Sequence, residues 1–348
     1  MKDILYGKTL TELQAVCAEL KMPGFTAKQI AQWLYQKDAR SIEDMTNVSK
    51  KNRSLLEEKY EVGRKEPLQV QVSVDGTKKY LFEALGNNFI ETAMIPDRDR
   101  KTVCVSSQVG CKMACVFCMT GKQGFQNQLT AGEILNQIFS IEEGQAITNI
   151  VYMGMGEPFD NIDEVLKSLT ILTSEWGYAM SPRRITVSSI GIVPSLKRFL
   201  YESECHLAIS MHTPFDEERR ELMPIQKAYS IKEVVEEIKD FDFGLQRRVS
   251  FEYIMFKGVN DTQAHVKELA RLIGGLRCRI NLIRFHAIPD ASLEGTDLAR
   301  MEEFRDALNK KNIMATIRSS RGQDIFAACG LLSTKALLKR NEEIGMSN

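Results

Sequence analysis

The amino-acid sequence predicts an α/β fold: an open parallel barrel of about six βα units, preceded by a small helical unit and a β linker. From about residue 101 onward, short β-type runs alternate regularly with amphipathic helical stretches, which is typical of a parallel sheet with helical crossovers. Residues 1–65 show helical periodicity only, and residues 68–107 switch to β-type alternation. The 348 residues, 43% of them apolar, are enough for one large domain with a small appendage.

The first 65 residues are expected to form a helical accessory domain that binds RNA. Amphipathic periodicity interrupted by polar turns predicts short helices over 10–20, 27–37, 41–45 and 50–60. Basic side chains on such short helices suit a nucleic-acid backbone. An ordinary docking or capping domain is the alternative.

Residues 66–100 are expected to form a β linker that bridges the two domains. Val70, Val72 and Val74 alternate with other residues and lead into Asp75-Gly76. An Asp-Gly pair between two such runs is a strong hairpin signal. We therefore expect a β-hairpin that turns at this pair.

Residues 101–348 are expected to form the core domain. Strands are predicted over 102–106, 149–153, 185–188, 206–210, 249–255, 279–284 and 314–318, and helices over 130–143, 161–174, 192–202, 230–241, 261–272 and 297–311. Thr130 and Glu133 form a capping box at the start of the first helix. In parallel α/β folds the loops that follow the strands gather at one edge. The polar and glycine-rich segments after these strands should therefore meet at one mouth.

Charge and cysteine usage exclude several classes of protein. The sequence contains 46 basic residues (Lys and Arg) and 46 acidic residues (Asp and Glu), so its formal net charge is zero. The molecule as a whole therefore does not attract a polyanion, and any nucleic-acid contact must be local. The N-terminus lacks the apolar core of a signal peptide, and no apolar run is long enough to span a membrane. We therefore expect a cytoplasmic protein with no membrane partner. We also expect it to be a monomer. The eight scattered cysteines do not resemble the framework of a small secreted domain. Basic doublets are expected to be solvated unless they meet RNA: Lys50-Lys51, Arg183-Arg184, Arg219-Arg220 and Arg247-Arg248.

The most informative segment is the loop after the first core strand, where Cys111, Cys115 and Cys118 form a C-x3-C-x2-C triplet. Such a triplet can hold three irons of a [4Fe-4S] cluster and leave the fourth iron open to a ligand that is not protein. A structural zinc site is the alternative, but it normally closes with four protein ligands. The nearest downstream candidates, Cys205 and His206, complete neither a second C-x2-C nor an H-x3-H pattern.

Two further segments follow predicted strands. In Gly154-Met155-Gly156-Glu157-Pro158 the glycines allow close approach of the backbone, and the carboxylate of Glu157 is suited to gripping an ammonium group. A tight turn with a solvated glutamate is the alternative. His212 is expected to hydrogen-bond beside Ser210 rather than to bind metal.

Taken in order, the cysteine triplet and five further motifs resemble the RlmN/Cfr family of radical S-adenosylmethionine (SAM) RNA methyltransferases, over nearly the whole chain. The resemblance implies a radical SAM partial (β/α)6 barrel, and it is closest to the branch that methylates C2 of adenine in 23S ribosomal RNA and in some transfer RNAs. The five motifs are Gly-Met-Gly-Glu-Pro (154–158), Ser-Pro-Arg-Arg-Ile-Thr-Val-Ser (181–188), Leu-Ala-Ile-Ser-Met-His (207–212), Arg-Ile-Asn-Leu-Ile-Arg-Phe-His (279–286) and Asp-Ile-Phe-Ala-Ala-Cys-Gly (324–330).

The resemblance also implies residue roles. It places the cluster on the cysteine triplet, with Cys329 as the methyl-carrying cysteine, Cys104 as its resolving partner and Glu91 as the proton acceptor. Family members often carry Asn where this chain has His286, which is a departure from the pattern. The implied SAM contacts are Gly156, Glu157, Ser188, Ser210, Met211, His212 and His286.

The implied chemistry explains why these parts are needed. Adenine C2 is electron-poor and does not attack a sulfonium methyl group, so the family first methylates a cysteine thiolate, here that of Cys329. A second SAM is cleaved to a 5′-deoxyadenosyl radical, which activates the S-methyl group for addition to C2. Glu91 then takes the C2 proton, and Cys104 attacks Cys329 to release the product as a transient disulfide. The route consumes two SAM per turnover and requires an electron donor for the cluster and the disulfide.

Two rival interpretations remain open at this point. Methylation at C8 of adenine, the other activity of the family, uses the same motifs. A zinc-stapled RNA-binding protein without catalysis would use the helical unit as its reader.

Overall fold

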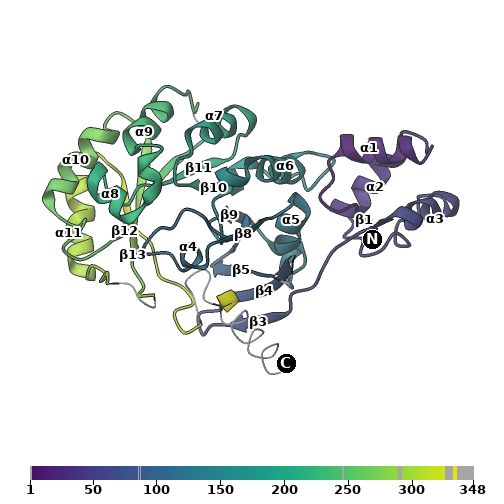
Figure 1. The fold of residues 1–348 in the computed structure, drawn as a ribbon, viewed down its shortest axis with the longest axis horizontal. Coiled ribbons are helices and arrows are strands. Elements are labelled where there is room, and N and C mark those ends of the chain that lie inside the picture. The colour runs from purple at the N-terminus through teal and green to yellow at the C-terminus, as the bar shows by residue number, and fades with distance from the viewer. Residues whose placement is uncertain are drawn as a thin grey trace.

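A computed structural model of the chain describes residues 2–84, 86, 88–244, 247–288, 292–325 and 332–334. The molecule is elongated, with the N-terminal helices at one end and a large sheet covered by helices at the other (Figure 1). In the described part of the chain, the helices are all too short or too polar to cross a membrane.

The N-terminal unit is a small helical domain closed by a parallel pair of short strands. The predicted helix over 41–45 is wrong. These residues form turns, because the carboxylate of Asp44 accepts the backbone N–H groups of Arg40 and Ser41 and so competes with helix formation. The elements are β1 (Asp3–Ile4), α1 (Leu10–Glu19), α2 (Thr26–Tyr35), α3 (Lys50–Lys59) and β2 (Tyr60–Glu61).

A single sheet of ten strands forms the frame of the core, in the order β14-β13-β12-β11-β10-β9-β6-β5-β4-β3. The strands from β6 to β14 in this order run parallel, and β5, β4 and β3 extend the sheet antiparallel beyond β6. The strands are β3 (Gln69–Val72), β4 (Lys78–Ala84), β5 (Asn88–Asp97), β6 (Arg100–Cys104), β9 (Asn149–Tyr152), β10 (Ile185–Ser189), β11 (His206–Ser210), β12 (Val249–Met255), β13 (Cys278–Arg284) and β14 (Ala315–Ile317).

A longer helix connects each parallel strand to the next, which gives the repeated βα units expected from the sequence and confirms the predicted fold class. These helices are α5 (Ala131–Phe139), α6 (Ile162–Thr173), α7 (Val193–Glu202), α9 (Ile231–Lys239), α10 (Gln263–Ile273) and α11 (Leu298–Asn309). The sequence did not indicate the short elements among the loops: β7 (Gln108–Gly110), α4 (Met119–Gln123), β8 (Phe125–Gln128), α8 (Asp216–Leu222) and the 3₁₀ turns Gly144–Ala146, Pro158–Asn161, Pro182–Arg184 and Pro224–Lys227.

The predicted β-hairpin lies between β3 and β4, with its turn over residues 73–77. Gly76 adopts a φ of +82°, a conformation that L side chains rarely adopt, and the carboxylate of Asp75 accepts the backbone N–H of Thr77 at 2.9 Å. Because β5 pairs with β6, the hairpin belongs to the edge of the core sheet.

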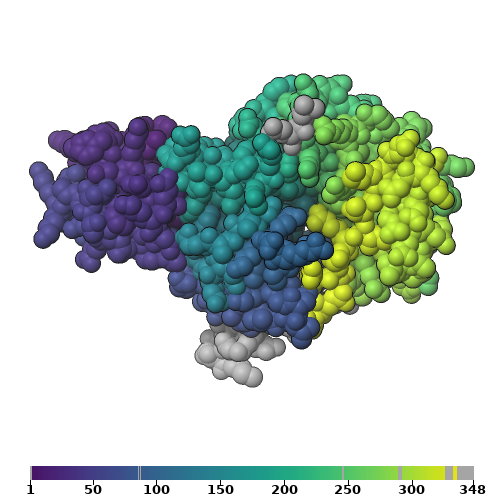
Figure 2. Space-filling model, turned by 180° about the vertical axis from the view of Figure 1, so that it is seen from behind, coloured from purple at the N-terminus to yellow at the C-terminus, as the bar shows by residue number. Residues whose placement is uncertain are grey.

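The N-terminal domain packs on the core through aromatic rings and one buried arginine. The hydroxyl groups of Tyr6 and Tyr178 are 2.5 Å apart, and the ring of Phe139 stacks on that of Tyr178. The buried guanidinium of Arg64 binds both the carboxylate of Asp38 and the backbone carbonyl of Phe139. In the space-filling view the N-terminal lobe sits directly against the teal part of the core (Figure 2).

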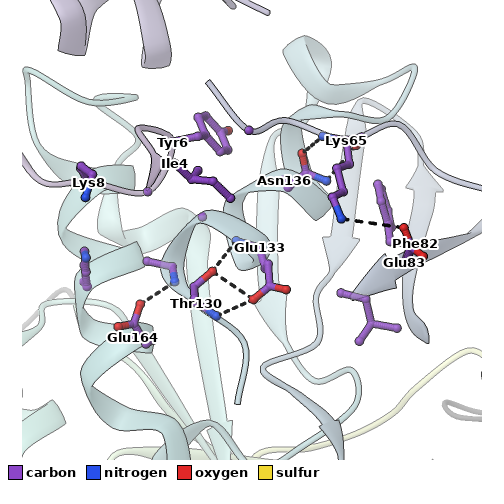
Figure 3. A pocket seen from close by; sticks show the side chains of 16 residues that line it. Ile4, Tyr6, Lys8, Lys65, Phe82, Glu83, Thr130, Glu133, Asn136 and Glu164 are labelled. Atoms are coloured by element: carbon purple, nitrogen blue, oxygen red, sulfur yellow. Dashed lines mark hydrogen bonds and ion pairs between the residues drawn. The ribbon is translucent and has the colours of Figure 1, made fainter. Parts of the chain in front are cut away.

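A cavity of about 260 Å³ remains between the two domains (Figure 3). Charged side chains on its wall are already engaged: Glu133 caps α5, Glu164 accepts the backbone N–H of Ala131 at 2.6 Å, and Lys65 pairs with Glu83 at 3.8 Å. The cysteine triplet does not line this cavity, so we place the functional site elsewhere.

Candidate functional site

The two faces of the sheet differ sharply in chemistry. One face packs under the helices and is apolar, with Val103, Ile150, Val187, Ile209 and Phe251 all fully buried in the main core. Side chains of residues paired across a ladder point to the same face of a sheet. The register therefore gathers polar and reactive side chains on the opposite face, here named the polar face: Lys79, Glu91, Cys104, Thr186, Ser188, Ser210, Glu252, Asn281 and Thr316.

The polar face brings together two of the three residues predicted to be catalytic. Cys104 is the last residue of β6 and lies opposite Ala93 of β5, and Glu91 is two residues before Ala93 on the same face. Glu91 is buried, whereas Cys104 is partly exposed. Ser106 connects this region to the next loop, because its hydroxyl donates to the carbonyl of Glu91 and accepts the backbone N–H of Met155.

The third predicted catalytic residue, Cys329, lies outside the described residues, but the chain on its C-terminal side docks on the polar face. The backbone N–H of Ser333 donates to Oε1 of Glu91 at 2.6 Å, and its hydroxyl accepts from Nε2 of Gln123 at 3.0 Å. Leu332 packs with Leu81 and Phe89. Residues 332–334 are thus tied both to β5 and to the helix that follows the cysteine triplet.

The chain on the N-terminal side of Cys329 docks on the β3–β4 turn. Asp324 accepts the hydroxyl of Ser73 at 2.5 Å and the backbone N–H of Val74 at 3.0 Å. Asp75 accepts the backbone N–H of Gly322 at 2.9 Å. The yellow chain before Asp324 accordingly lies beside the blue hairpin in the space-filling view (Figure 2).

The cysteine triplet forms a compact loop next to this face. Gly110, before the triplet, has a φ of +71°, and a Cβ there would lie 1.7 Å from the carbonyl oxygen of Gly124, so only glycine fits. The backbone N–H of Cys111 donates to that same carbonyl at 3.1 Å, and the N–H of Cys118 donates to the carbonyl of Cys115 at 3.1 Å. Backbone hydrogen bonds therefore close the loop that carries the three thiols.

The surroundings of the triplet fit a group that brings positive charge. The thiols pack with apolar side chains, among them Met223, Phe256 and Phe285. Burial raises the pKa of Cys111 to about 12 and also raises the pKa of Cys115. Buried thiols of this kind lose their protons only to a metal centre, which deprotonates the thiols that coordinate it.

Within the described residues, no three His, Cys, Asp or Glu side chains are gathered so as to hold a single metal ion. A [4Fe-4S] cluster does not require such a gathering, because each of its cysteines binds a different iron atom. The three thiols from one loop are a suitable donor set for three of those irons.

The Gly154-Met155-Gly156-Glu157-Pro158 loop lies against the strand that leads to the triplet. Gly156 has a φ of +95°, and a Cβ there would lie 2.5 Å from Cβ of Gln108. The carboxylate of Glu157 accepts the backbone N–H groups of Phe159 at 3.0 Å and Ile190 at 3.1 Å. Burial raises its pKa to about 7, so this carboxylate gains more than a solvated one from a cationic ligand.

His212 is buried and makes a structural hydrogen bond, as expected. Its Nδ1 accepts the backbone N–H of Ile254 at 3.0 Å, and its ring packs edge-on against Phe117. Burial, together with the nearby Arg219, lowers the pKa of His212 to about 3, so the ring is neutral at pH 7. Ser188 and Ser210 lie half-buried at the ends of neighbouring strands.

His286 lies at the end of β13, where it is exposed to solvent. Its Nε2 is 2.9 Å from the hydroxyl of Ser320, which follows β14. His286 therefore contacts the chain that leads toward Asp324 and the β3–β4 turn.

Arg219 is the functional residue that the sequence analysis missed most clearly. The expectation that the Arg219-Arg220 doublet is solvated is wrong for Arg219, which is fully buried. Its guanidinium donates to the side chain of Gln226 and to the carbonyls of three loop residues, Ile190, Ser210 and Met211, at 2.6 to 3.2 Å. Burial lowers its pKa to about 10, so the side chain is charged at pH 7. The sequence did contain a signal of this burial, because helical spacing places Arg219 on the same helix face as the apolar residues Phe215 and Leu222.

A second missed group is a polar network on β12, β13 and β14, centred on the buried Glu252 and Asn281. Oε1 of Glu252 accepts from the hydroxyl of Ser250 at 2.9 Å and from Nδ2 of Asn281 at 2.7 Å, and Oδ1 of Asn281 accepts from the hydroxyl of Thr316 at 3.1 Å. A glutamate inside the otherwise apolar run 249–255 was the sequence signal for it. This network stiffens the far half of the polar face.

Replacing Arg219 with methionine should destabilise the protein by about 3 kcal/mol, because three buried carbonyls then lose their donor. The denaturant midpoint of unfolding should therefore fall. The matched control is Arg220→Met, at an exposed neighbouring position, with an expected change within about 0.5 kcal/mol. Equal midpoints for the two variants would contradict the bracing role of Arg219.

Comparisons with known proteins match this chain to two family models and to named relatives. Residues 105–273 match the family model of the radical SAM superfamily, and residues 4–62 match that of the ribosomal RNA large subunit methyltransferase N-terminal domain. A protein of Phocaeicola vulgatus, named "Probable dual-specificity RNA methyltransferase RlmN", is 58% identical over 99% of this chain and 98% of its own length. The chain belongs to the RlmN family of radical SAM RNA methyltransferases. Membership of the radical SAM superfamily implies a [4Fe-4S] cluster and SAM as cofactors.

Two more distant relatives agree with this assignment. "Dual-specificity RNA methyltransferase RlmN" of Nitratiruptor sp. is 42% identical over 97% of this chain and 99% of its own length. The crystal structure of a radical SAM methyltransferase from Sphaerobacter thermophilus superposes with a TM-score of 0.88 at 39% identity, and the match covers 94% of this chain and 98% of that one. The RlmN-type fold described above is therefore that of a solved methyltransferase over nearly its full length.

Proposed function

We propose that this protein methylates C2 of adenosine in 23S ribosomal RNA and in transfer RNA, through a methyl group carried on Cys329. The observation that carries the proposal is the polar face itself, where Glu91 and Cys104 lie on adjacent strands and Ser333, four residues after Cys329, is bound to Glu91.

The cofactors are assigned to neighbouring loops. Cys111, Cys115 and Cys118 would hold the [4Fe-4S] cluster, which when bound supplies the electron that cleaves SAM to a 5′-deoxyadenosyl radical. We assign two SAM to each turnover and an external electron donor to the cluster. The chain's groups that would bind and orient SAM are Gly156, Glu157, Ser188, Ser210, Met211, His212 and His286. Among them, the buried carboxylate of Glu157 would grip the ammonium of the methionine part.

The three catalytic side chains divide the work. The Cys329 thiolate takes the methyl group from the first SAM. An oxygen of the Glu91 carboxylate accepts the proton from adenine C2. The Cys104 thiolate attacks the sulfur of Cys329, forms a disulfide and so frees the RNA, after which a reductant restores both thiols.

The names of the matched families support the choice of RNA. The N-terminal 59 residues matched, 4–62, carry a ribosomal RNA methyltransferase description, and the curated relatives are named dual-specificity enzymes. We therefore assign two RNA substrates to this chain, with the N-terminal helical domain as the part that binds them. We also propose that the protein acts in the cytoplasm as a monomer.

The decisive experiment is nucleoside mass analysis of protein-free ribosomal RNA and transfer RNA after anaerobic incubation with the protein, SAM and a reductant. We expect 2-methyladenosine in both RNAs, and iron and sulfide in the purified protein. Methyl groups found on C8 would contradict the C2 assignment. A colourless protein with stoichiometric zinc and no methylation would instead support a non-catalytic RNA-binding protein.

A further inference from the structure

Lys79 and Glu91 form an ion pair in the interior of the protein. Nζ of Lys79 lies 2.6 Å from Oε2 of Glu91, and their side chains are only 3% and 2% exposed. Lysine and glutamate are almost never so fully buried unless they are paired. Neither the motifs in the sequence nor the comparisons assign any role to Lys79.

The pairing follows from the strand register. Lys79 of β4 lies opposite Ala93 of β5, and Cys104 of β6 lies opposite the same residue on its other side. Lys79, Glu91 and Cys104 thus share the polar face around Ala93. The ammonium is directed at the group proposed to accept the proton, within the same small area as the proposed resolving thiol.

The two oxygens of the Glu91 carboxylate have different partners. Oε2 faces the ammonium of Lys79, while Oε1 accepts the backbone N–H of Ser333 at 2.6 Å. An ammonium fixed on one oxygen sets the plane of the carboxylate and therefore the direction of the other oxygen. The ion pair consequently helps to hold the chain that follows Cys329.

Stability alone is a weak reason for such a pair. Moving two charges out of water is costly, and apolar side chains of similar volume often give equal or greater stability. A buried negative charge without a cation beside it is strongly unfavourable. Lys79 therefore supplies the compensating positive charge that a proton-accepting carboxylate needs in this buried position.

We propose that Lys79 is a positioning residue for the methyl transfer: its ammonium orients the Glu91 carboxylate, both as the acceptor of the C2 proton and as the docking point for Ser333. The inference rests on the proposed function, which makes Glu91 the proton acceptor. It adds Lys79 to the machinery without giving it contact with the reacting atoms.

Turnover and three further observations on each of five variants test the role of Lys79. The three observations are iron content, S-methylation of Cys329 by peptide mass analysis, and RNA covalently attached to protein in a denaturing gel. For Lys79→Met we expect normal iron and normal S-methylation, a turnover reduced roughly tenfold to a hundredfold, and accumulation of the protein–RNA adduct, because the step that fails is proton removal. Lys79→Arg should recover most of the turnover, since it restores a cation of similar reach.

The double variant Lys79→Met with Glu91→Gln separates stability from catalysis. Removing both charges should restore the melting temperature that the single change lowers, while the adduct still accumulates. Lys78→Met is the matched control, because Lys78 is the preceding residue, points to the other face and pairs with Glu142 and Glu143. Its turnover should remain at the wild-type level.

The outcomes separate the inference from the proposed function. If Glu91→Gln accumulates the adduct and Lys79→Met turns over normally, the role of Lys79 is refuted while the proton acceptor stands. If Lys79→Met loses iron and S-methylation in proportion to turnover, its role is merely structural and the inference fails. If Glu91→Gln itself turns over normally, the proposed acceptor is wrong, and the inference that rests on it falls with it.

Discussion

Cys329→Ala should abolish methyl transfer to RNA, by at least about a thousandfold, while the iron–sulfur absorbance of the protein persists. The thiol at this position is the only place for the methyl group in the proposed route, since adenine C2 does not react directly with a sulfonium. The proposed cluster ligands belong to a different segment, over 200 residues earlier in the sequence, so the change leaves them in place. Transfer of labelled methyl groups to RNA and the visible spectrum measure the two effects.

The matched control for this variant is Cys278→Ala. Cys278 lies at the start of β13, packs against the main core and has no part in the proposed chemistry. Both its activity and its spectrum should stay close to those of the unchanged protein. Retained methylation in Cys329→Ala would overturn the assignment of the methyl carrier, and loss of the spectrum would show that Cys329 serves the cluster instead.

Cys104→Ala should leave the enzyme covalently attached to its RNA after a single reaction. Methylation of Cys329, radical addition and proton transfer to Glu91 do not involve Cys104, so the reaction stops only at the release step. The position of Cys104 at the end of β6, on the same face as Glu91, suits the resolving role proposed for it. A denaturing gel should show RNA migrating with protein, stable to added thiols.

A buried cysteine away from the polar face provides the control for this experiment. Cys205→Ala should turn over normally and give no attached RNA, because Cys205 is buried among core residues before β11. Free RNA without any adduct in Cys104→Ala would reject the resolving role.

Most of the fold could be predicted because local pattern determines it. Alternating apolar residues placed the seven parallel strands, and the capping box of Thr130 and Glu133 placed the start of α5, which the structure confirms at both side chains. The Asp75-Gly76 turn was equally local. The helix expected over 41–45 failed because the carboxylate of Asp44 turns back to accept the N–H groups of Arg40 and Ser41, which holds this short segment in a turn.

The motif residues of the site were predictable, but the charged residues that support them were not. Arg219 and Glu252 had weak local signals of burial, in their apolar neighbours at helical and strand spacing, whereas nothing local shows that Lys79 is buried. Their partners are set by the tertiary fold: Arg219 reaches the carbonyl of Ile190 across 29 positions, and Lys79 meets Glu91 through strand pairing. Only the register of the finished sheet shows that Lys79 and Glu252 share one face with Cys104.

The contact between the N-terminal helices and the sheet has a consequence for how the chain can be divided. One continuous hydrophobic core runs from Leu5 and Tyr35 to Val103 and Phe304, and Arg64 is sealed inside it. The two parts are therefore not interchangeable modules, although they match separate families. Truncating the chain near residue 65 would strip a wall from the remaining domain and expose apolar surface to water, so we expect the two parts to unfold together as a single cooperative unit.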